Sequence, residues 1–264
     1  MNVFLQELRF HRKTVLIWNV SLVLTLILML FIYPAVMSEK ASYEAILASL
    51  PPGLLEAFSI DFETFMSFNG FLGYTYTYML IALGVLAMNL GLSALGKEVS
   101  GKTADFLMTR PISRVRLLTE KILAGITLLT LTNLLIGITI WGMTLVLGVK
   151  DSDMGVTLLI ILGGFIVQII FYALGIFIGI SRKRIRYITS LSLSFVFTFY
   201  ILAMVSQVVK KEYLFYLTPF RYFDFNRIII DKGFELKYIA VSAAVIIIAA
   251  SASYITLKQK EIHV

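Results

Sequence analysis

Six long apolar runs without a charged residue or a histidine constrain this chain more than any other feature of its sequence. Each run is long enough to form a helix across about 30 Å of hydrocarbon, which needs about 20 residues. Strands of a membrane barrel would alternate in polarity over about 10 residues, whereas a helix pairs its own backbone polar groups in lipid. We therefore predict an all-α integral membrane protein with six transmembrane helices, over residues 15–36, 68–95, 122–149, 154–180, 188–209 and 238–257.

The composition supports this class and excludes several kinds of site. The chain is 59% hydrophobic with a mean hydropathy of +0.88, against about 45–50% apolar residues in soluble domains. It has no cysteine, which rules out disulfides and thiolate metal sites. His11 and His263 lie near opposite termini and belong to no ligand cluster. We therefore predict no metal and no cofactor.

The distribution of Lys and Arg predicts the orientation in the membrane. With a cytoplasmic N-terminus, the segments on that side carry 15 Lys and Arg residues and the opposite segments carry 8. Acidic residues show the reverse bias, with 5 inside and 11 outside. We predict a multi-pass plasma-membrane protein with both termini in the cytoplasm. The net charge of +7 then reflects topology, and we predict no nucleic-acid partner.

Two flanking segments have patterns of their own. Residues 1–14 alternate apolar and charged side chains, which predicts an amphipathic helix lying on the membrane surface; a plain basic flank of the first span is the alternative. Before the last span, residues 213–217 either continue the fifth span or re-enter the outer leaflet. Pro219 should then turn the chain, and residues 223–230 should form a short interfacial helix on the outer face.

The predicted spans contain polar side chains but no ionisable carboxylate, lysine, arginine or histidine. Ion-coupled carriers usually need such groups within the membrane to relay protons or ions. If this protein moves a solute uphill, the energy must therefore enter from outside the bilayer. The amides available within the spans are Asn19, Asn89, Asn133, Gln168 and Gln207.

Two glycine patterns call for interpretation. Gly175 and Gly179 form a GxxxG spacing, which predicts close helix packing; chance occurrence in a glycine-rich span is the alternative. Residues 91–97 match the first part of a P-loop, but Glu98 stands where a Ser or Thr should bind magnesium. No buried strand pattern precedes it, so we predict no nucleotide site in this chain.

A polar, basic segment of residues 96–121 separates the second and third predicted spans. Residues 98–109 can form a helix of about three turns, with Val99, Phe106 and Leu107 near one face. Such a helix would offer an apolar edge to a soluble partner, while held at both ends by membrane helices. An ordinary basic connector is the alternative.

The end of this segment has recognisable signals. Pro111 should end the helix, and Ser113 should N-cap the next one. The whole pattern resembles the coupling region of type 2 ABC exporter permeases, which have Glu, then Gly-Thr, a Leu-rich stretch and Pro-hydrophobic-Ser-Arg. This chain departs in one respect, since Lys102 separates Gly101 from Thr103. The pattern in this chain, with Lys102 as the departure, comprises Glu98, Lys102, Thr103, Phe106, Leu107, Pro111, Ile112, Ser113, Arg114, Leu117, Leu118 and Lys121.

The resemblance covers essentially the whole chain and implies its function. It implies a single permease domain over residues 1–264 that pairs with a second permease copy or a paralogue and is driven by two separate ABC ATPase subunits. ATP hydrolysis would belong to those subunits, so this chain would not be an enzyme. The alternatives are a non-transporting membrane anchor or sensor and, less well supported, a lipid-modifying membrane enzyme. The residues expected to couple to the ATPase are Glu98, Val99, Lys102, Thr103, Phe106, Leu107, Arg110 and Arg114.

The sequence constrains the identity of the cargo less than it constrains the source of energy. Apolar helix faces without buried charge favour an amphipathic or lipid-like substrate, such as an antimicrobial peptide or a drug, over a small ion.

Overall fold

The computed structural model describes residues 3–51, 53–54, 62–100, 113–150, 152–182 and 185–259. All regular secondary structure in this part of the chain is helical, which confirms the predicted fold class. The elements are α1 (Val3–Ser38), α2 (Lys40–Ser49), α4 (Phe62–Phe65), α5 (Phe68–Ser100), α7 (Arg114–Val146), α8 (Met154–Ser181), α9 (Ile188–Val209), α10 (Glu212–Phe215), η1 (Pro219–Arg221), α11 (Phe225–Asp231) and α12 (Leu236–Gln259).

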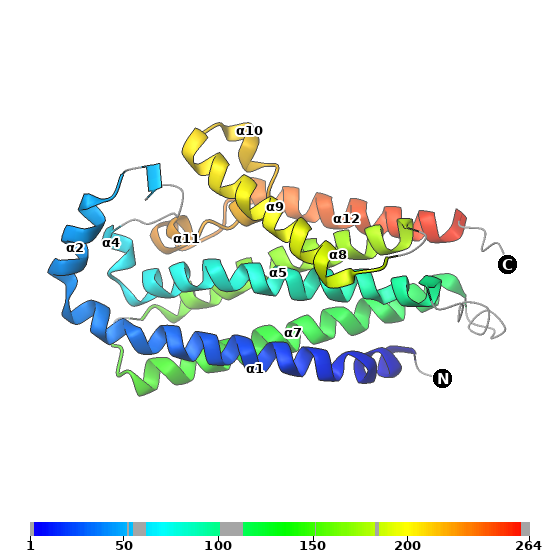
Figure 1. Ribbon diagram of the computed structural model, residues 1–264, viewed down its shortest axis with the longest axis horizontal. Helices are drawn as coiled ribbons and strands as arrows, with labels where there is room; N and C mark the ends of the chain where they lie inside the picture. Colours follow the sequence, from blue (N-terminus) through cyan, green and yellow to red (C-terminus); the bar gives the residue numbers. More distant parts are fainter. Residues whose placement is uncertain are drawn as a thin grey trace.

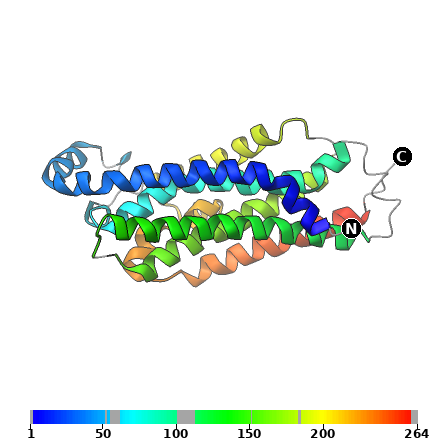
Figure 2. The same ribbon diagram turned by 90° about the horizontal axis from the view of Figure 1, so that it is seen from below.

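Six helices are long and apolar enough to cross a membrane, and they correspond to the six predicted spans: α1, α5, α7, α8, α9 and α12. The amphipathic segment expected at the N-terminus is not a separate helix, because α1 already begins at Val3. Figure 2 shows that the first turns of α1 bend away from the rest of this helix and lie close to the start of α7. Helix α1 starts and α12 ends at the same end of the bundle (Figure 1).

Helices α5 and α8 form the centre of the bundle. Helices α1 and α7 lie on one side of them, and α9 and α12 on the other (Figure 1). The most apolar windows of α5 and α8 are 72% and 56% buried, against 17% for both α9 and α12. The two central helices therefore carry most of the packed core, and the peripheral helices turn most of their surface outward.

Glycines allow α5 and α8 to pack at very short distance. A Cβ atom on Gly91 would lie 2.4 Å from the carbonyl oxygen of Tyr172, and one on Gly175 would lie 2.8 Å from that of Met88. Gly179 faces the carbonyl of Leu92 in the same way, at 3.0 Å. The predicted GxxxG contact is thus confirmed, and Gly91 is a packing residue of a membrane helix.

Gly91→Ala is expected to lower the unfolding free energy by about 1–3 kcal/mol, because the new methyl group meets backbone atoms that cannot rotate away. The matched control is Gly142→Ala in α7, where a Cβ would meet nothing within 4 Å. There, alanine should be neutral or stabilise the helix by up to about 1 kcal/mol. SDS-induced unfolding in mixed micelles measures both changes; equal effects of the two substitutions would contradict the close contact.

Four of the five amides noted in the spans join helices to one another. Asn133 in α7 and Gln168 in α8 exchange two hydrogen bonds of 3.2 Å, with the buried hydroxyl of Tyr76 donating to Asn133 at 3.4 Å. Asn19 accepts a hydrogen bond of 2.9 Å from Thr132, which links α1 to α7. Asn89 accepts one of 2.7 Å from Ser192, which links α5 to α9. These side chains therefore stabilise the bundle by satisfying each other in an apolar interior.

The hairpin between α7 and α8 is short, as predicted, and Asp153 organises it. Its carboxylate accepts hydrogen bonds from the backbone N–H groups of Gly155 and Val156 and so caps α8. Lys232 donates to the same carboxylate at 2.8 Å. This hydrogen bond makes the largest contribution to lowering the pKa of Asp153, and the backbone hydrogen bonds that cap α8 lower it further. Asn69 in α5 exchanges hydrogen bonds with the backbone of Asp153, so three parts of the chain meet here.

The segment before the last span forms the short helices that the sequence predicts. Helix α9 ends at Val209, and Lys210 adopts a left-handed conformation with φ of 54°. The run 213–217 therefore does not continue the fifth span, and α10 is a separate short helix. Pro219 begins η1. Helix α11 begins two residues later than the helix expected over 223–230 and ends one residue later.

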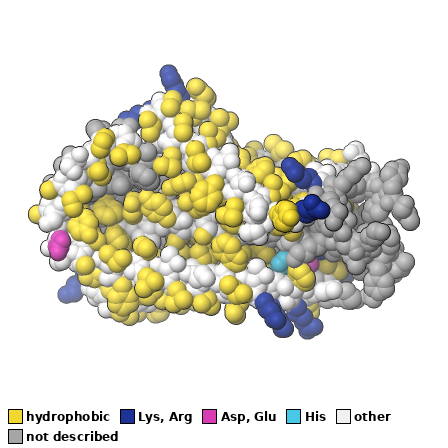
Figure 3. All heavy atoms as spheres, in the orientation of Figure 1, with side chains coloured by type: hydrophobic (Ala, Val, Ile, Leu, Met, Phe, Trp, Pro, Cys, Tyr) yellow, Lys and Arg dark blue, Asp and Glu magenta, His cyan; other side chains and the backbone are white. Residues whose placement is uncertain are grey.

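The outer surface of the bundle fits a membrane environment. Large apolar side chains of α1, α7, α9 and α12 are exposed, among them Ile17, Ile138, Ile201 and Ile248. Figure 3 shows apolar side chains covering the middle of one face, with Lys and Arg side chains at its margins. The protein is therefore a multi-pass membrane protein.

Candidate functional site

The predicted coupling residues divide into two groups. Glu98 and Val99 lie in the last turn of α5, which continues to Ser100 beyond the predicted span. Arg114 is the first residue of α7. The coupling helix itself stays a prediction, because the other residues lie outside the described part of the chain. They are Lys102, Thr103, Phe106, Leu107 and Arg110.

The start of α7 has the predicted cap. Ser113 has extended backbone angles, φ −66° and ψ 142°, and its side chain accepts a hydrogen bond of 3.3 Å from the backbone N–H of Arg116. This fixes the direction in which the chain enters α7. The described part of α5 ends at Ser100 and α7 begins at Arg114, on either side of residues 101–112, which lie outside the described part of the chain.

Two turns into α7, Lys121 is buried, with 4% of its side chain exposed. Its ammonium group donates a hydrogen bond of 2.5 Å to the carbonyl oxygen of Ala94 in α5. It also pairs with the carboxylate of Glu7 in α1 at 3.2 Å. One cation at the end of residues 96–121 thus joins three helices.

Glu7 has a second partner in its own helix. Nε2 of His11 lies 3.2 Å from the other carboxylate oxygen, and both side chains are mostly buried. We call Glu7, His11 and Lys121, together with the Ala94 carbonyl, the Lys121 cluster. It holds the bent N-terminal part of α1 against the junction of α5 and α7.

Neighbouring residues of α7 extend these contacts. The carboxylate of Glu120 accepts hydrogen bonds from the backbone N–H of Phe4, at 3.3 Å, and from Arg116, at 2.8 Å. The hydroxyl of Thr119 lies 2.7 Å from that of Tyr254 in α12. Tyr172 of α8 donates to the carbonyl oxygen of Lys121 at 3.1 Å. Three consecutive residues of α7 therefore bind four other helices.

Comparison with known protein families decides what kind of membrane protein this is. A family model described as "ABC-2 family transporter protein" matches residues 1–262. The chain belongs to the ABC-2 transporter family. No curated protein matches the chain.

For this ABC-2 family protein, membership agrees with the resemblance carried by the segment between the second and third spans. A member of the family is a membrane transport component that is not itself catalytic. Membership of the family also implies ABC ATPases as partners. Among the described residues, no group of three His, Cys, Asp or Glu side chains is placed to hold a metal ion.

Sequence reasoning missed the Lys121 cluster. The sequence predicts that Glu7 lies in a helix on the membrane surface and Lys121 in a polar segment, with no buried charge on the helix faces, whereas the structure buries Lys121 and most of Glu7. One signal could have indicated the pairing: Lys121 directly precedes an uncharged run of 28 residues, 122–149, and Glu7 is the single acidic residue of the N-terminal segment 1–14. A cation so close to lipid needs an anionic or carbonyl partner.

Proposed function

We propose that this chain is the permease subunit of an ATP-driven exporter, assembled as two permeases, identical or paralogous, with two ABC ATPase subunits. Residues 96–121 would form the surface that docks on the ATPase, with the apolar edge of Phe106 and Leu107 in a pocket of that partner. The observation that carries this proposal is the set of contacts made by residues 119–121, at the C-terminal end of this segment. They bind α1, α5, α8 and α12.

These contacts support a route for mechanical coupling. A displacement of the segment by the ATPase acts on the end of α5 and the start of α7 at once, because it is continuous with both. The Lys121 cluster ties the N-terminal turns of α1 to the same point. Breaking a buried ion pair by removing one partner is costly, so α1, α5 and α7 should move together there.

The proposed cargo is amphipathic or lipid-like. The spans expose mainly apolar side chains, and the amides of Asn19, Asn89, Asn133 and Gln168 are engaged in contacts between helices. A hydrophilic ion would find few free ligands along such helices, whereas a molecule with apolar surface can follow them. Export, rather than import, follows from the resemblance of the coupling segment to exporter permeases.

The function is tested by purifying the tagged chain from its native membranes in mild detergent. An ATPase with P-loop and ABC signature motifs should co-purify, and the pair in lipid vesicles should hydrolyse ATP at a rate that amphipathic peptides or drugs raise. The chain alone should neither bind nor hydrolyse ATP. An assembled complex that hydrolyses ATP but moves none of a panel of such compounds would instead support an anchor or sensor.

The proposed orientation is tested with single cysteines, because the natural chain has none. Ser152→Cys in the turn before α8 should react with a membrane-impermeant maleimide in intact cells. Ser181→Cys at the exposed end of α8 should react only after the membrane is opened. Labelling in the reverse order would invert the topology, and labelling of both sites in intact cells would break the six-span arrangement.

A further inference from the structure

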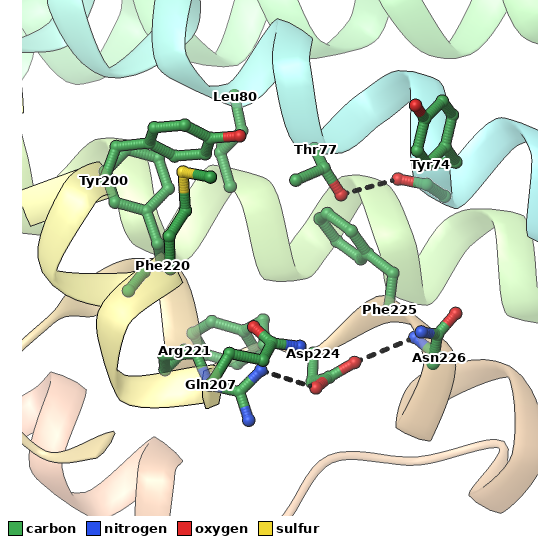
Figure 4. A pocket seen from close by; sticks show the side chains of 14 residues that line it. Tyr74, Thr77, Leu80, Tyr200, Gln207, Phe220, Arg221, Asp224, Phe225 and Asn226 are labelled. Carbon is green, nitrogen blue, oxygen red and sulfur yellow. Dashed lines mark hydrogen bonds and ion pairs between the residues drawn. The ribbon is translucent and has the colours of Figure 1, made fainter. Parts of the chain in front are cut away.

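Two hollows of the described bundle differ in size and chemistry. The smaller, of about 50 Å³, lies between α5, α9, η1 and α11 (Figure 4). Arg221 donates a hydrogen bond of 2.8 Å to Asp224 there, and Asp224 accepts another of 3.1 Å from the backbone N–H of Asn226. These contacts join η1 to α11, so the small cavity belongs to the packing of the fold. The larger hollow is a pocket of about 410 Å³ between α7 and α8.

The pocket between α7 and α8 forms because each helix packs mainly on another one, α7 on α1 and α8 on α5. The two helices are joined by the short hairpin at one end and, further along, by Asn133 and Gln168, whose amides exchange two hydrogen bonds of 3.2 Å. Gly137 lies between these two points and has no side chain to fill the space. A Cβ there would meet only the end of the Ile161 side chain, at 3.6 Å.

The lining of the pocket is mainly apolar and open to the side. Leu134, Ile138 and Trp141 of α7 are between 55% and 65% exposed. The polar side chains of the lining, Thr130 and Asn133, are already engaged. Thr130 donates a hydrogen bond of 2.9 Å to a backbone carbonyl of its own helix, and Asn133 belongs to the amide pair. An occupant is therefore held by its apolar surface.

The size of the pocket matches one hydrocarbon chain. An apolar cavity of about 150 Å³ holds benzene, so 410 Å³ has room for roughly 16 carbon atoms at the same packing. Thr130 and Trp141 are 11 residues apart, which is about 16 Å along a helix. This is about half of the 30 Å hydrocarbon thickness of a bilayer, the distance that one lipid chain covers.

A protein segment fits the pocket less well. A helix about 10 Å across would occupy about 1,200 Å³ over the same length, three times the volume of the pocket. Ten residues line the pocket, whereas a stable protein interface uses about 20–30 residues on each side. The lining is thus too small for a second copy of the chain and large enough for a single hydrocarbon chain.

The uncharged runs place the pocket within the hydrocarbon. Asn133 and Gln168 lie near the middle of the runs 122–149 and 154–180. From near this pair the pocket extends along both helices towards the hairpin, so it lies mainly in one half of the membrane. A lipid chain of that leaflet runs in the same direction and enters from the exposed side of the pocket.

We propose that this pocket binds one hydrocarbon chain of a membrane lipid, held by the chain and not by the headgroup. Packing favours the bound chain, because the lining of an empty apolar space lacks contact partners, whereas transfer from the bilayer exchanges one apolar environment for another. A bound chain fills the gap between α7 and α8 and so stabilises the folded protein. The lining includes no residue of 96–121, so failure of this proposal would leave the proposed function intact.

The test uses the full-length chain in digitonin, a detergent that has no linear hydrocarbon chain to compete for the pocket. Tritiated dipalmitoyl phosphatidylcholine should bind saturably, at about one molecule per chain. Unlabelled phosphatidylglycerol with the same chains should displace it within about twofold of unlabelled phosphatidylcholine, whereas glycerophosphocholine, the headgroup alone, should not displace it. Displacement by glycerophosphocholine, a strong preference for one headgroup, or the absence of saturable binding would each overturn the proposal.

Two identical substitutions in α7 locate the site. Gly137→Leu places a side chain in the pocket and should weaken binding about tenfold, through the loss of on the order of ten carbon–carbon contacts. Gly142→Leu is the matched control, because a Cβ there meets nothing within 4 Å and the residue lies outside the pocket; its affinity should stay within about twofold of wild type. Trp141→Ala removes a half-exposed wall and should weaken binding about threefold. Wild-type affinity in both pocket variants would refute the site, even if one of them folds poorly.

Light scattering on the same samples tests whether a second copy of the chain covers the pocket instead. The number of chains per particle should be the same for the wild type, Gly137→Leu and Gly142→Leu. If Gly137→Leu changes this number while its affinity for phosphatidylcholine stays that of the wild type, the pocket is a contact between protein chains and the proposal is wrong.

Discussion

Replacing Lys121 with methionine is expected to lower the unfolding free energy by about 3–5 kcal/mol, the cost of leaving a buried charge without its partner. Lys121 is almost fully buried, and its removal leaves the Glu7 carboxylate with His11 as its remaining side-chain partner in the cluster. It also leaves the Ala94 carbonyl without its donor. SDS-induced unfolding in mixed micelles measures the loss, and ATPase activity of the reconstituted complex should become insensitive to substrate.

A double-mutant cycle separates the ion pair from simple packing. Glu7→Gln alone should also destabilise, whereas Glu7→Gln with Lys121→Met should lose clearly less than the sum of the two changes. The pair of Arg116 and Glu120 provides the control, because Arg116 is 73% exposed; Arg116→Gln should cost less than about 1 kcal/mol. Strictly additive effects of Glu7 and Lys121 would show that the two side chains do not stabilise each other.

The six spans could be predicted from the sequence because the cost of burying a charge or an unpaired backbone group in lipid is large. That cost is local, so an uninterrupted apolar run is enough to place a helix. The ends of the helices were predicted less well: α1 begins at Val3 and α5 continues to Ser100. Where a membrane helix extends beyond its apolar run, hydropathy does not mark its last residue. The position of that residue depends on caps and on contacts with other helices. Ser113 carried such a local signal, and its cap was predicted correctly.

The Lys121 cluster could not be predicted in the same way, because it depends on contacts between residues more than 100 positions apart. Glu7 and Lys121 meet only when α1 bends across the start of α7. The pairing of Asn133 with Gln168 is a similar case: both amides were noted in the sequence, but their partners were not. The sequence indicates which polar groups need partners, and the packing of α7 against α1 and α8 decides which partners they find.

Phe106→Ala is expected to weaken assembly with the ATPase by about 30-fold or more. An aromatic side chain that fills a buried pocket of an interface often contributes at least about 2 kcal/mol, and each 1.4 kcal/mol is a factor of about ten in affinity. Phe106→Asp should be worse, because it would place an unpaired charge in that pocket. The prediction rests on the sequence, since Phe106 lies outside the described residues. Pull-down of the ATPase by the tagged chain measures the loss.

Tyr187→Ala provides the matched control for Phe106. Tyr187 is an aromatic residue on the same predicted side of the membrane, 70% exposed, at the start of α9 and without a side-chain capping bond. Its removal should leave assembly unchanged. All three variants should reach the membrane in normal amounts, because neither residue lies within a span. If both Phe106 variants assemble like wild type, Phe106 is not the anchor, and the Lys121 cluster would have to receive the force of the ATPase through another part of residues 96–121.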